Sequence, residues 1–304
     1  LSIRRQRQMC IRDRFTGPFF TYATIKDTDR DEISETTFIN MRAPYNKPYS
    51  VTLNPEYTLY PLTGSAYYNM GPLPKFTGEE TPSITIHYDD EGTRVRSDNV
   101  GAFNSKFFMM ERRMENGQQE GFTGDVNSFD GKVTGTLTNN YGQEVDNVAI
   151  LLYNQMILIG HMEPGETVSL DGMKVIYGIT NFGYAMAEQI TGASRYKEDK
   201  DIRDAAYVQA LERTNLLSFY MGNYLSGYHS EARVLGFSNE KEETGFLKSS
   251  NYETYGSTLL TSSIDVNYEQ DGMIYKSALQ KQPNVLSGEY YASNNSMYGL
   301  TPVM

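Results

Sequence analysis

The most apolar stretch of the chain, VAILLYNQMILIG, constrains the fold more than any other feature. It runs over the 13 residues from Val148 to Gly160 and is interrupted by Asn154 and Gln155. A membrane-spanning helix needs about 20 consecutive apolar residues, so this stretch is too short to cross a bilayer. Two buried β-strands with a tight connection at Asn154 and Gln155 fit the pattern better.

Turn residues follow this stretch closely. The sequence EPGE at 163–166 predicts a turn, because proline presets its own φ and glycine tolerates a positive φ. Two more short strands are expected after the turn, at Thr167–Leu170 and Lys174–Tyr177.

Alternation of apolar and polar residues dominates from about Pro48 onward, and this is the period of a half-buried strand. It predicts a hairpin over Ile84–Ser97 and a short strand at Lys106–Met110. About eight or nine short strands are expected up to Gly178, with the spacing of a β-sandwich. We therefore place a β-sandwich at residues 48–180.

Apolar residues then recur at spacings of three and four, which is the period of an amphipathic helix. This pattern predicts a short helix at Tyr184–Ile190 and a longer one that begins at about Asp199 or Asp201 and ends at Leu225. Residues 181–228 are accordingly assigned to a helical segment.

Strand character returns in residues 229–304, with candidate strands at Ala232–Phe237 and Leu260–Tyr268. The second strand alternates so regularly that one of its faces is expected to meet solvent. Asp271–Gly272 predicts a hairpin turn into a return strand at Met273–Leu279.

The predicted fold class is therefore mainly β with an α-helical insertion, a β-sandwich plus a smaller α+β portion. Residues 15–47 are expected to be an extended or loop segment. Residues 229–304 are expected to pack with the preceding regions.

Residues 1–14 are expected to lie outside the natural protein. They contain five arginines and one aspartate, and no apolar stretch follows them as it would in a signal peptide. The portion QRQMCIRDR closely resembles the conceptual translation of sequencing-adapter sequence, which implies that Cys10 is not native. The alternative is a basic tail that binds an acidic surface. The chain ends at LTPVM without a closing turn or charged tail, so we expect a fragment of a longer protein.

The composition indicates a globular, acidic protein. Hydrophobic residues make up 39% and charged residues 21%, with 11 prolines, which argues against disordered and collagen-like chains. The formal net charge of −11 repels a phosphate backbone, so nucleic acid is not expected as a partner. The single cysteine excludes an internal disulfide framework.

Residue types that carry catalysis or bind metals are few and show no recognised spacing. His87, His161 and His229 stand apart in the sequence, and each is expected to be an ordinary surface or hydrogen-bonded histidine. No Gly-x-Ser-x-Gly, Walker or dinucleotide-binding motif occurs in a strand-to-helix context. We therefore expect no enzyme and no cofactor, and we assign no catalytic, cofactor-binding or metal-binding residue.

Two acidic runs resemble calcium loops only in part. Asp27, Asp29 and Asp31 alternate, but Glu32 and Phe38 stand where an EF-hand requires Gly and Glu, so a solvated acidic loop is favoured. The second run consists of Glu198, Asp199, Asp201 and Asp204. Helix capping explains it at least as well as calcium binding. Two acids can also converge from distant strands without a local signature, so carboxylate-dependent hydrolysis stays open.

Tyrosines in loop-like segments are candidates for a carbohydrate-binding surface. They are Tyr67, Tyr68, Tyr290, Tyr291 and Tyr298. The chain has 24 Tyr but no Trp, and Trp is the most effective stacking residue. Tyrosines with buried rings and solvated hydroxyl groups are therefore the favoured interpretation.

The run GTLTNNYGQEVDNVAILLYNQMILIGHMEPGETVSL, Gly135–Leu170, resembles the Ig-like β-sandwich modules of bacterial extracytoplasmic proteins. The later ARVLGFS and STLLTSSIDVNYEQDG look like the membrane-proximal portion of large membrane-anchored proteins of Gram-positive bacteria. These resemblances imply an Ig-like sandwich outside the cytoplasm, tethered by a transmembrane helix beyond Met304. No functional residues carry over.

These features favour a non-enzymatic extracytoplasmic interaction or scaffold module of a bacterial cell-envelope protein. Its partner is expected to be a protein or a glycan at the envelope, and membrane contact is expected only through a segment outside this sequence. Two alternatives stay open, a carbohydrate-binding or adhesive surface domain and an accessory region of a carboxylate-dependent hydrolase.

Overall fold

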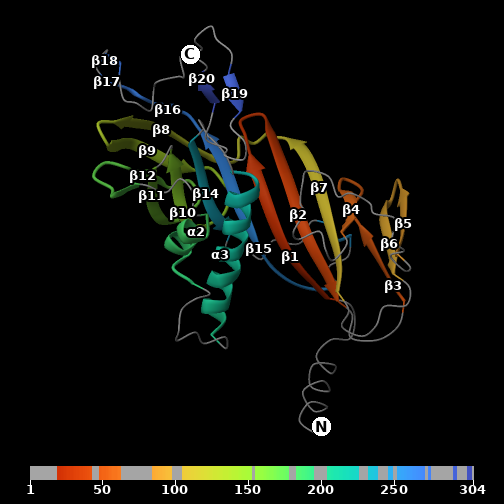
Figure 1. Ribbon diagram of the computed structural model, residues 1–304. Coiled ribbons are helices and arrows are strands. Elements are labelled where there is room, and N and C mark those ends of the chain that lie inside the picture. Colours follow the sequence, from red (N-terminus) through yellow and green to blue (C-terminus); the bar gives the residue numbers. More distant parts are fainter. Residues whose placement is uncertain are drawn as a thin grey trace.

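The fold is mainly β, with two helices in the described part of the chain (Figure 1). The computed structural model describes residues 19–42, 48–62, 84–97, 105–152, 155–177, 183–194, 204–225, 232–238, 246–248, 252–270, 273–274, 290–292 and 300–302. The predicted class, mainly β with an α-helical insertion, is confirmed.

One sheet of nine strands forms the centre of the fold, in the order β13-β11-β10-β14-β15-β1-β2-β7-β4. Its strands are β1 (Phe19–Thr28), β2 (Glu32–Arg42), β4 (Thr58–Leu62), β7 (Ser105–Glu115), β10 (Val145–Leu152), β11 (Gln155–Met162), β13 (Val175–Tyr177), β14 (Ala232–Ser238) and β15 (Glu253–Ile264). All neighbours are antiparallel except β1 and β15, which are parallel. The sheet therefore joins strands from distant parts of the sequence.

Smaller sheets complete the β structure. The four-stranded sheet has the order β12 (Thr167–Ser169), β9 (Lys132–Asn139), β8 (Phe122–Phe129) and β16 (Val266–Asn267). The three-stranded sheet has the order β3 (Tyr49–Leu53), β6 (Gly92–Ser97) and β5 (Ile84–Asp89). Two short pairs are formed by β17 (Glu269–Gln270) with β18 (Met273–Ile274) and by β19 (Tyr290–Ala292) with β20 (Leu300–Pro302).

Both smaller sheets pack on the same face of the large sheet, which we call the two-sheet face. Phe20 and Lys26 share a face of β1 because side chains alternate along a strand, and Lys26 pairs with Leu260 of β15. Phe20 lies in the core under the three-stranded sheet, whereas Leu260 lies in the core under the four-stranded sheet. The two cores therefore lie side by side on the same face.

The opposite face carries the helices, and we call it the helical face. Helix α2 spans Gly183–Thr191 and α3 spans Ala205–Asn223. The core beneath them includes Ile25, Ala149, Leu151, Met156, Leu217, Tyr220, Leu235, Phe237 and Leu259. Asp204 is the N-cap of α3, because its side chain accepts a hydrogen bond from the Ala206 N–H at 3.0 Å.

The segment 15–47 corrects part of one expectation from the sequence, which predicts an extended or loop segment. Its described residues are extended and form the hairpin β1-β2 in the middle of the large sheet. The apolar alternation of β2 is interrupted because Glu35 and Thr37 are buried among its apolar positions. A polar residue at a buried position hides the pattern that identifies a half-buried strand.

Strand β15 corrects a second expectation. The alternation from Leu260 to Tyr268 predicts a solvent-facing polar side, but Thr261 is fully buried. Its hydroxyl lies 3.3 Å from the Tyr220 hydroxyl on α3. The helix covers the side of the strand that the sequence assigns to water.

Other elements match the sequence predictions. The hairpin over Ile84–Ser97 is present as β5 and β6, and the apolar stretch Val148–Gly160 is divided between β10 and β11. Gly165 has a φ of +74° in the turn that follows. The short pair of β17 and β18 flanks the predicted turn at Asp271–Gly272. No helix within the described ranges is long and apolar enough to span a membrane.

Candidate functional site

The three histidines do not come together. His87 is an exposed residue of β5, and His229 lies outside the described residues. His161 Nδ1 is 2.7 Å from Asp146 Oδ1, and its Nε2 is 3.2 Å from Glu163 Oε1. The hydrogen bond to Asp146, followed by that to Glu163, raises the pKa of His161. The prediction of a hydrogen-bonded surface histidine is confirmed for His161.

The first acidic run forms ordinary polar contacts. Asp27 Oδ1 accepts a hydrogen bond from Arg233 Nη1 at 2.7 Å, and Asp29 Oδ1 accepts one from Ser263 Oγ at 2.7 Å. Within the described ranges, no group of three or more His, Cys, Asp or Glu side chains is placed to hold a metal ion.

The second acidic run is only partly described. Asp204 caps α3, as the capping interpretation predicts. Glu198, Asp199 and Asp201 lie outside the described residues, and α3 begins at Ala205, later than the sequence predicts.

The candidate carbohydrate-binding tyrosines cannot be placed as a surface. Tyr67, Tyr68 and Tyr298 lie outside the described residues. Tyr290 and Tyr291 belong to β19, but their side chains lie outside the described part. The idea that these tyrosines bind a glycan therefore stays a prediction.

A polar joint separates the two cores of the two-sheet face. Its members are Thr24, Lys26, Glu35, Thr37, Tyr57, Arg112, Glu120 and Tyr141. Arg112 Nη2 donates to Glu35 Oε2 at 2.6 Å, and Lys26 Nζ donates to Glu120 Oε2 at 2.7 Å. Each carboxylate in the joint faces a cation, so this arrangement is suited to connecting the two halves of the fold.

Among the described residues, the helices cover only part of the helical face. In Figure 1, α3 lies in front of β15, whereas no described element lies in front of β7 and β4. Phe38 of β2 pairs with Met109 of β7, which pairs with Tyr60 of β4. Cross-strand partners share a face, and Phe38 packs against the helical core. These three half-buried side chains therefore form an apolar row on the helical face.

Two neighbouring rows extend this surface. Asn40 pairs with Phe107 on one side of the apolar row, and Thr36 pairs with Glu111 on the other. We define the open patch as the surface formed by Phe38, Tyr60, Phe107, Met109 and Glu111. Tyr224, after α3, borders the patch and is 45% exposed. Tyr255 is 51% exposed and lies farther along the sheet, on β15 beside Thr21 of β1.

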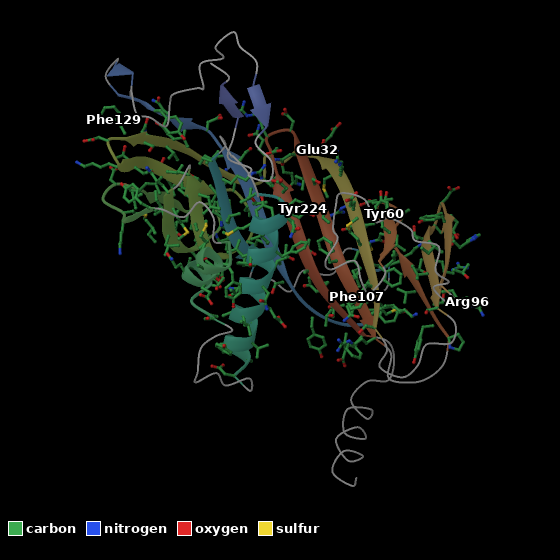
Figure 2. All side chains as sticks on the ribbon, in the orientation of Figure 1. Glu32, Tyr60, Arg96, Phe107, Phe129 and Tyr224 are labelled. Atoms are coloured by element: carbon green, nitrogen blue, oxygen red, sulfur yellow. The ribbon has the colours of Figure 1, made fainter. Side chains whose placement is uncertain are left out.

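Aromatic contacts hold the helical border of the open patch in place. The Phe219 ring packs edge-on against Phe38, with centroids 5.3 Å apart. Tyr224 stacks on Tyr220 with centroids 5.5 Å apart, and it forms a side-chain hydrogen bond with Thr36. Burial and the nearby Glu111 carboxylate raise the pKa of Tyr224. Figure 2 labels Tyr224, Tyr60 and Phe107, which mark this part of the molecule.

One signal in the sequence points to the open patch. The run KFFMM, 106–110, has four successive apolar residues, so both faces of its strand are apolar. Phe108 and Met110 are buried in the two-sheet face, and Phe107 and Met109 are left for the helical face. Strands that are apolar on both faces are normally buried on both faces. In β7, second from the edge of its sheet, this pattern indicates an apolar surface on the helical face in addition to the one buried on the two-sheet face.

The chain therefore combines a large central sheet, two cores on one face and an open apolar patch on the other. The family described as "Domain of unknown function (DUF8725)" matches residues 121–267. No curated protein matches the sequence.

Comparison with solved structures gives only distant likenesses. The yeast delta-COP-I mu-homology domain in complex with a Dsl1 WxWxV peptide is 8% identical, with a TM-score of 0.35, over 84% of this chain and 98% of that one. The same yeast domain without the peptide is 9% identical, with a TM-score of 0.34 and the same coverage. The adhesin domain of Epf from Streptococcus pyogenes is 8% identical, with a TM-score of 0.15, over 79% of this chain and 80% of that one. These scores carry no argument about function.

Proposed function

We propose that this chain is a non-enzymatic interaction module and that its open patch docks a protein partner. The observation that carries the proposal is the row of Phe38, Met109 and Tyr60, half-buried side chains that run from the edge of α3 across β7 and β4, where no described element covers the sheet. Aromatic residues and Met are enriched, and charged residues depleted, at the centres of protein interfaces.

The mechanism of docking follows from burial. A partner that covers the row removes apolar surface from water, which contributes about 25 cal/mol per Å². The row is presented by neighbouring β-strands and supported from behind by buried Met110 and Phe108. A preformed surface of this kind loses little conformational entropy when a partner binds.

A peptide selection tests this function. A random-peptide library displayed on phage is selected against the wild-type chain, and binding of the enriched peptides is then measured on Met109→Asp and Leu158→Asp. Leu158 is a matched control because it is an exposed apolar residue, at 39% exposure, on β11 far along the sheet order. We expect Met109→Asp to weaken binding at least tenfold, about 1.4 kcal/mol, and Leu158→Asp to leave it unchanged.

Two results contradict the proposal. Equal binding to both variants removes the open patch as the docking surface. A glycan array that gives binding sensitive to Met109→Asp, with no peptide enriched, makes the ligand a carbohydrate instead. Thermal unfolding of each variant shows whether the fold is retained.

The non-enzymatic part of the proposal rests on the sequence, which holds no recognised catalytic motif. The purified chain is expected to leave a panel of glycans and peptides uncleaved. Cleavage that is lost when one specific acid is changed contradicts this expectation and favours the hydrolase alternative.

The proposed location is extracytoplasmic, in a cell-envelope protein tethered by a transmembrane helix outside this sequence. The support is the resemblance of Gly135–Leu170 to extracytoplasmic modules and, for the tether, that of ARVLGFS and STLLTSSIDVNYEQDG to membrane-proximal segments. Protease treatment of intact source cells is expected to digest this region. Protection in intact cells with digestion after lysis contradicts the location and leaves the docking proposal untouched.

A further inference from the structure

One carboxylate stands out in the open patch. Glu111 is exposed and lies on the same face of β7 as Met109, roughly 7 Å away along the strand. Within the described ranges no cation lies at ion-pair distance from it. It is the single charged side chain of the open patch.

The neighbouring cations are already engaged. Arg112 points to the opposite face and contacts Glu35 at 2.6 Å and Glu56 at 3.0 Å. Arg113 shares the face of Glu111, but it lies 3.6 Å from Glu32. An internal partner for Glu111 is therefore absent from its own strand.

A partner that covers the open patch must also take Glu111 out of water. Burying an unpaired carboxylate is strongly unfavourable. A cation on the partner that forms an ion pair with the carboxylate offsets this cost. Lys and Arg are suited to this position, because their aliphatic stems cover apolar surface while the charged head reaches a nearby group. The chain's net charge of −11 also attracts a basic partner at long range.

We infer that the open patch binds a basic, apolar protein segment, with a Lys or Arg paired to Glu111 and an adjacent apolar side chain packed against Phe38, Met109 and Tyr60. This inference rests on the proposed function and adds the chemistry of the partner. The single carboxylate sets specificity by disfavouring purely apolar or acidic segments.

The test uses the same displayed library. Peptides selected on the wild type are expected to be enriched in Lys or Arg next to aromatic or aliphatic residues. Peptides selected on Glu111→Lys are expected to carry Asp or Glu at that place. A wild-type peptide is expected to bind Glu111→Gln about tenfold more weakly, and its affinity for the wild type is expected to fall with added salt.

Glu115→Gln is the matched control, since Glu115 is an exposed carboxylate on the same face of β7, beyond the open patch. It is expected to change affinity less than twofold. Both variants alter exposed residues, and their thermal unfolding verifies the fold.

The outcomes separate the two proposals. Peptides that lose binding on Met109→Asp but show no preference for cations, and bind Glu111→Gln as well as the wild type, overturn this inference and leave the docking function standing. Peptides whose binding is insensitive to Met109→Asp overturn both.

Discussion

Arg112 Nη2 lies 2.6 Å from Glu35 Oε2, at the joint between the two cores of the two-sheet face. The Tyr57 hydroxyl donates to the other oxygen of Glu35 at 3.0 Å, and the Arg112 guanidinium lies 4.7 Å from the centre of the Tyr57 ring. Strands β2, β7 and the segment before β4 therefore meet at one largely buried ion pair. Side chains alternate along β7, so Arg112 lies on the two-sheet face and the neighbouring Glu111 lies on the helical face.

The variant Arg112→Met is expected to destabilise the fold. Among the described residues, it leaves the buried Glu35 carboxylate with Tyr57 as its remaining side-chain donor, and removal of one partner from a buried pair lowers the free energy of unfolding by about 3 kcal/mol. Urea unfolding measures this loss. The double variant Arg112→Met with Glu35→Met is expected to recover part of it, because both charges are then gone.

Arg113→Met provides the control for this experiment. Arg113 pairs with Glu32 at 3.6 Å, with side chains 76% and 53% exposed. Exposed pairs contribute little, so the expected change is below about 0.5 kcal/mol. Equal losses in Arg112→Met and Arg113→Met contradict the assignment of the joint as a stabilising element.

Tyr141 predicts how stability changes at high pH. Its hydroxyl is buried and contacts Thr28 and Ser262 at 3.1 Å each. Burial raises the pKa of Tyr141, so the unfolded chain ionises this group first. The stabilising effect is complete below the unfolded-state pKa of about 10 and decreases as pH rises above it.

The measurement is urea unfolding at several pH values above 10. Each tyrosine held neutral in the fold lowers the free energy of unfolding by about 1.4 kcal/mol per pH unit. With Tyr141→Phe, the free energy of unfolding is expected to fall less steeply with pH. The difference in slope corresponds to one proton, about 1.4 kcal/mol per pH unit. An unchanged slope shows that Tyr141 ionises equally in both states.

His161 gives a prediction near neutral pH. Since the hydrogen bond to Asp146 is the main cause of its raised pKa, Asp146→Asn is expected to lower that pKa more than Glu163→Gln does. Titration of the imidazole proton signals by NMR measures both. The stabilising effect of protonated His161 is expected to be present at low pH and lost as pH rises through its pKa in the fold.

This effect on stability is small because His161 is 45% exposed. It is expected to stay below about 1 kcal/mol after screening by solvent. A larger fall in pKa with Glu163→Gln than with Asp146→Asn reverses the assigned order of the two partners.

Gly135 predicts a backbone effect in the four-stranded sheet. Its φ is +110°, and a Cβ atom there lies 1.9 Å from the Asp125 carbonyl oxygen on the neighbouring strand. Gly135→Ala is therefore expected to lower the free energy of unfolding by about 2 kcal/mol or more.

Gly142→Ala is the matched control, because nothing lies within 4 Å of its added Cβ. It is expected to be neutral or to stabilise by about 0.5 kcal/mol, through a smaller unfolded-state entropy. Similar destabilisation by both substitutions contradicts the close approach at Gly135.

The local elements were largely predictable from the sequence. Turn residues at 163–166 and the apolar stretch Val148–Gly160 define β10, β11 and the following turn without long-range information. The spacing of three and four residues between apolar positions, which predicts α2 and α3, is likewise a local pattern. In contrast, the hairpin β1-β2 was missed because Glu35 and Thr37 are buried through partners that lie far away in sequence.

The open patch was beyond local patterns for a similar reason. It exists because β2 pairs with β7 and β7 with β4, and because α3 covers only part of the helical face (Figure 1). The sequence shows that Phe107 and Met109 are apolar, but tertiary structure decides that they remain half-buried. The two faces of β15 were mistaken because the helix that covers Thr261 belongs to another segment.

The most direct test of the docking surface compares two adjacent methionines. Met109 is half-buried on the open patch, and Met110 is fully buried on the opposite face of the same strand. With ¹³C-labelled methionine methyl groups, assigned through Met109→Leu and Met110→Leu, addition of a selected peptide is followed by NMR. We expect the Met109 signal to shift with peptide concentration while the Met110 signal stays in place. A peptide that binds but leaves the Met109 signal unmoved contradicts docking at the open patch.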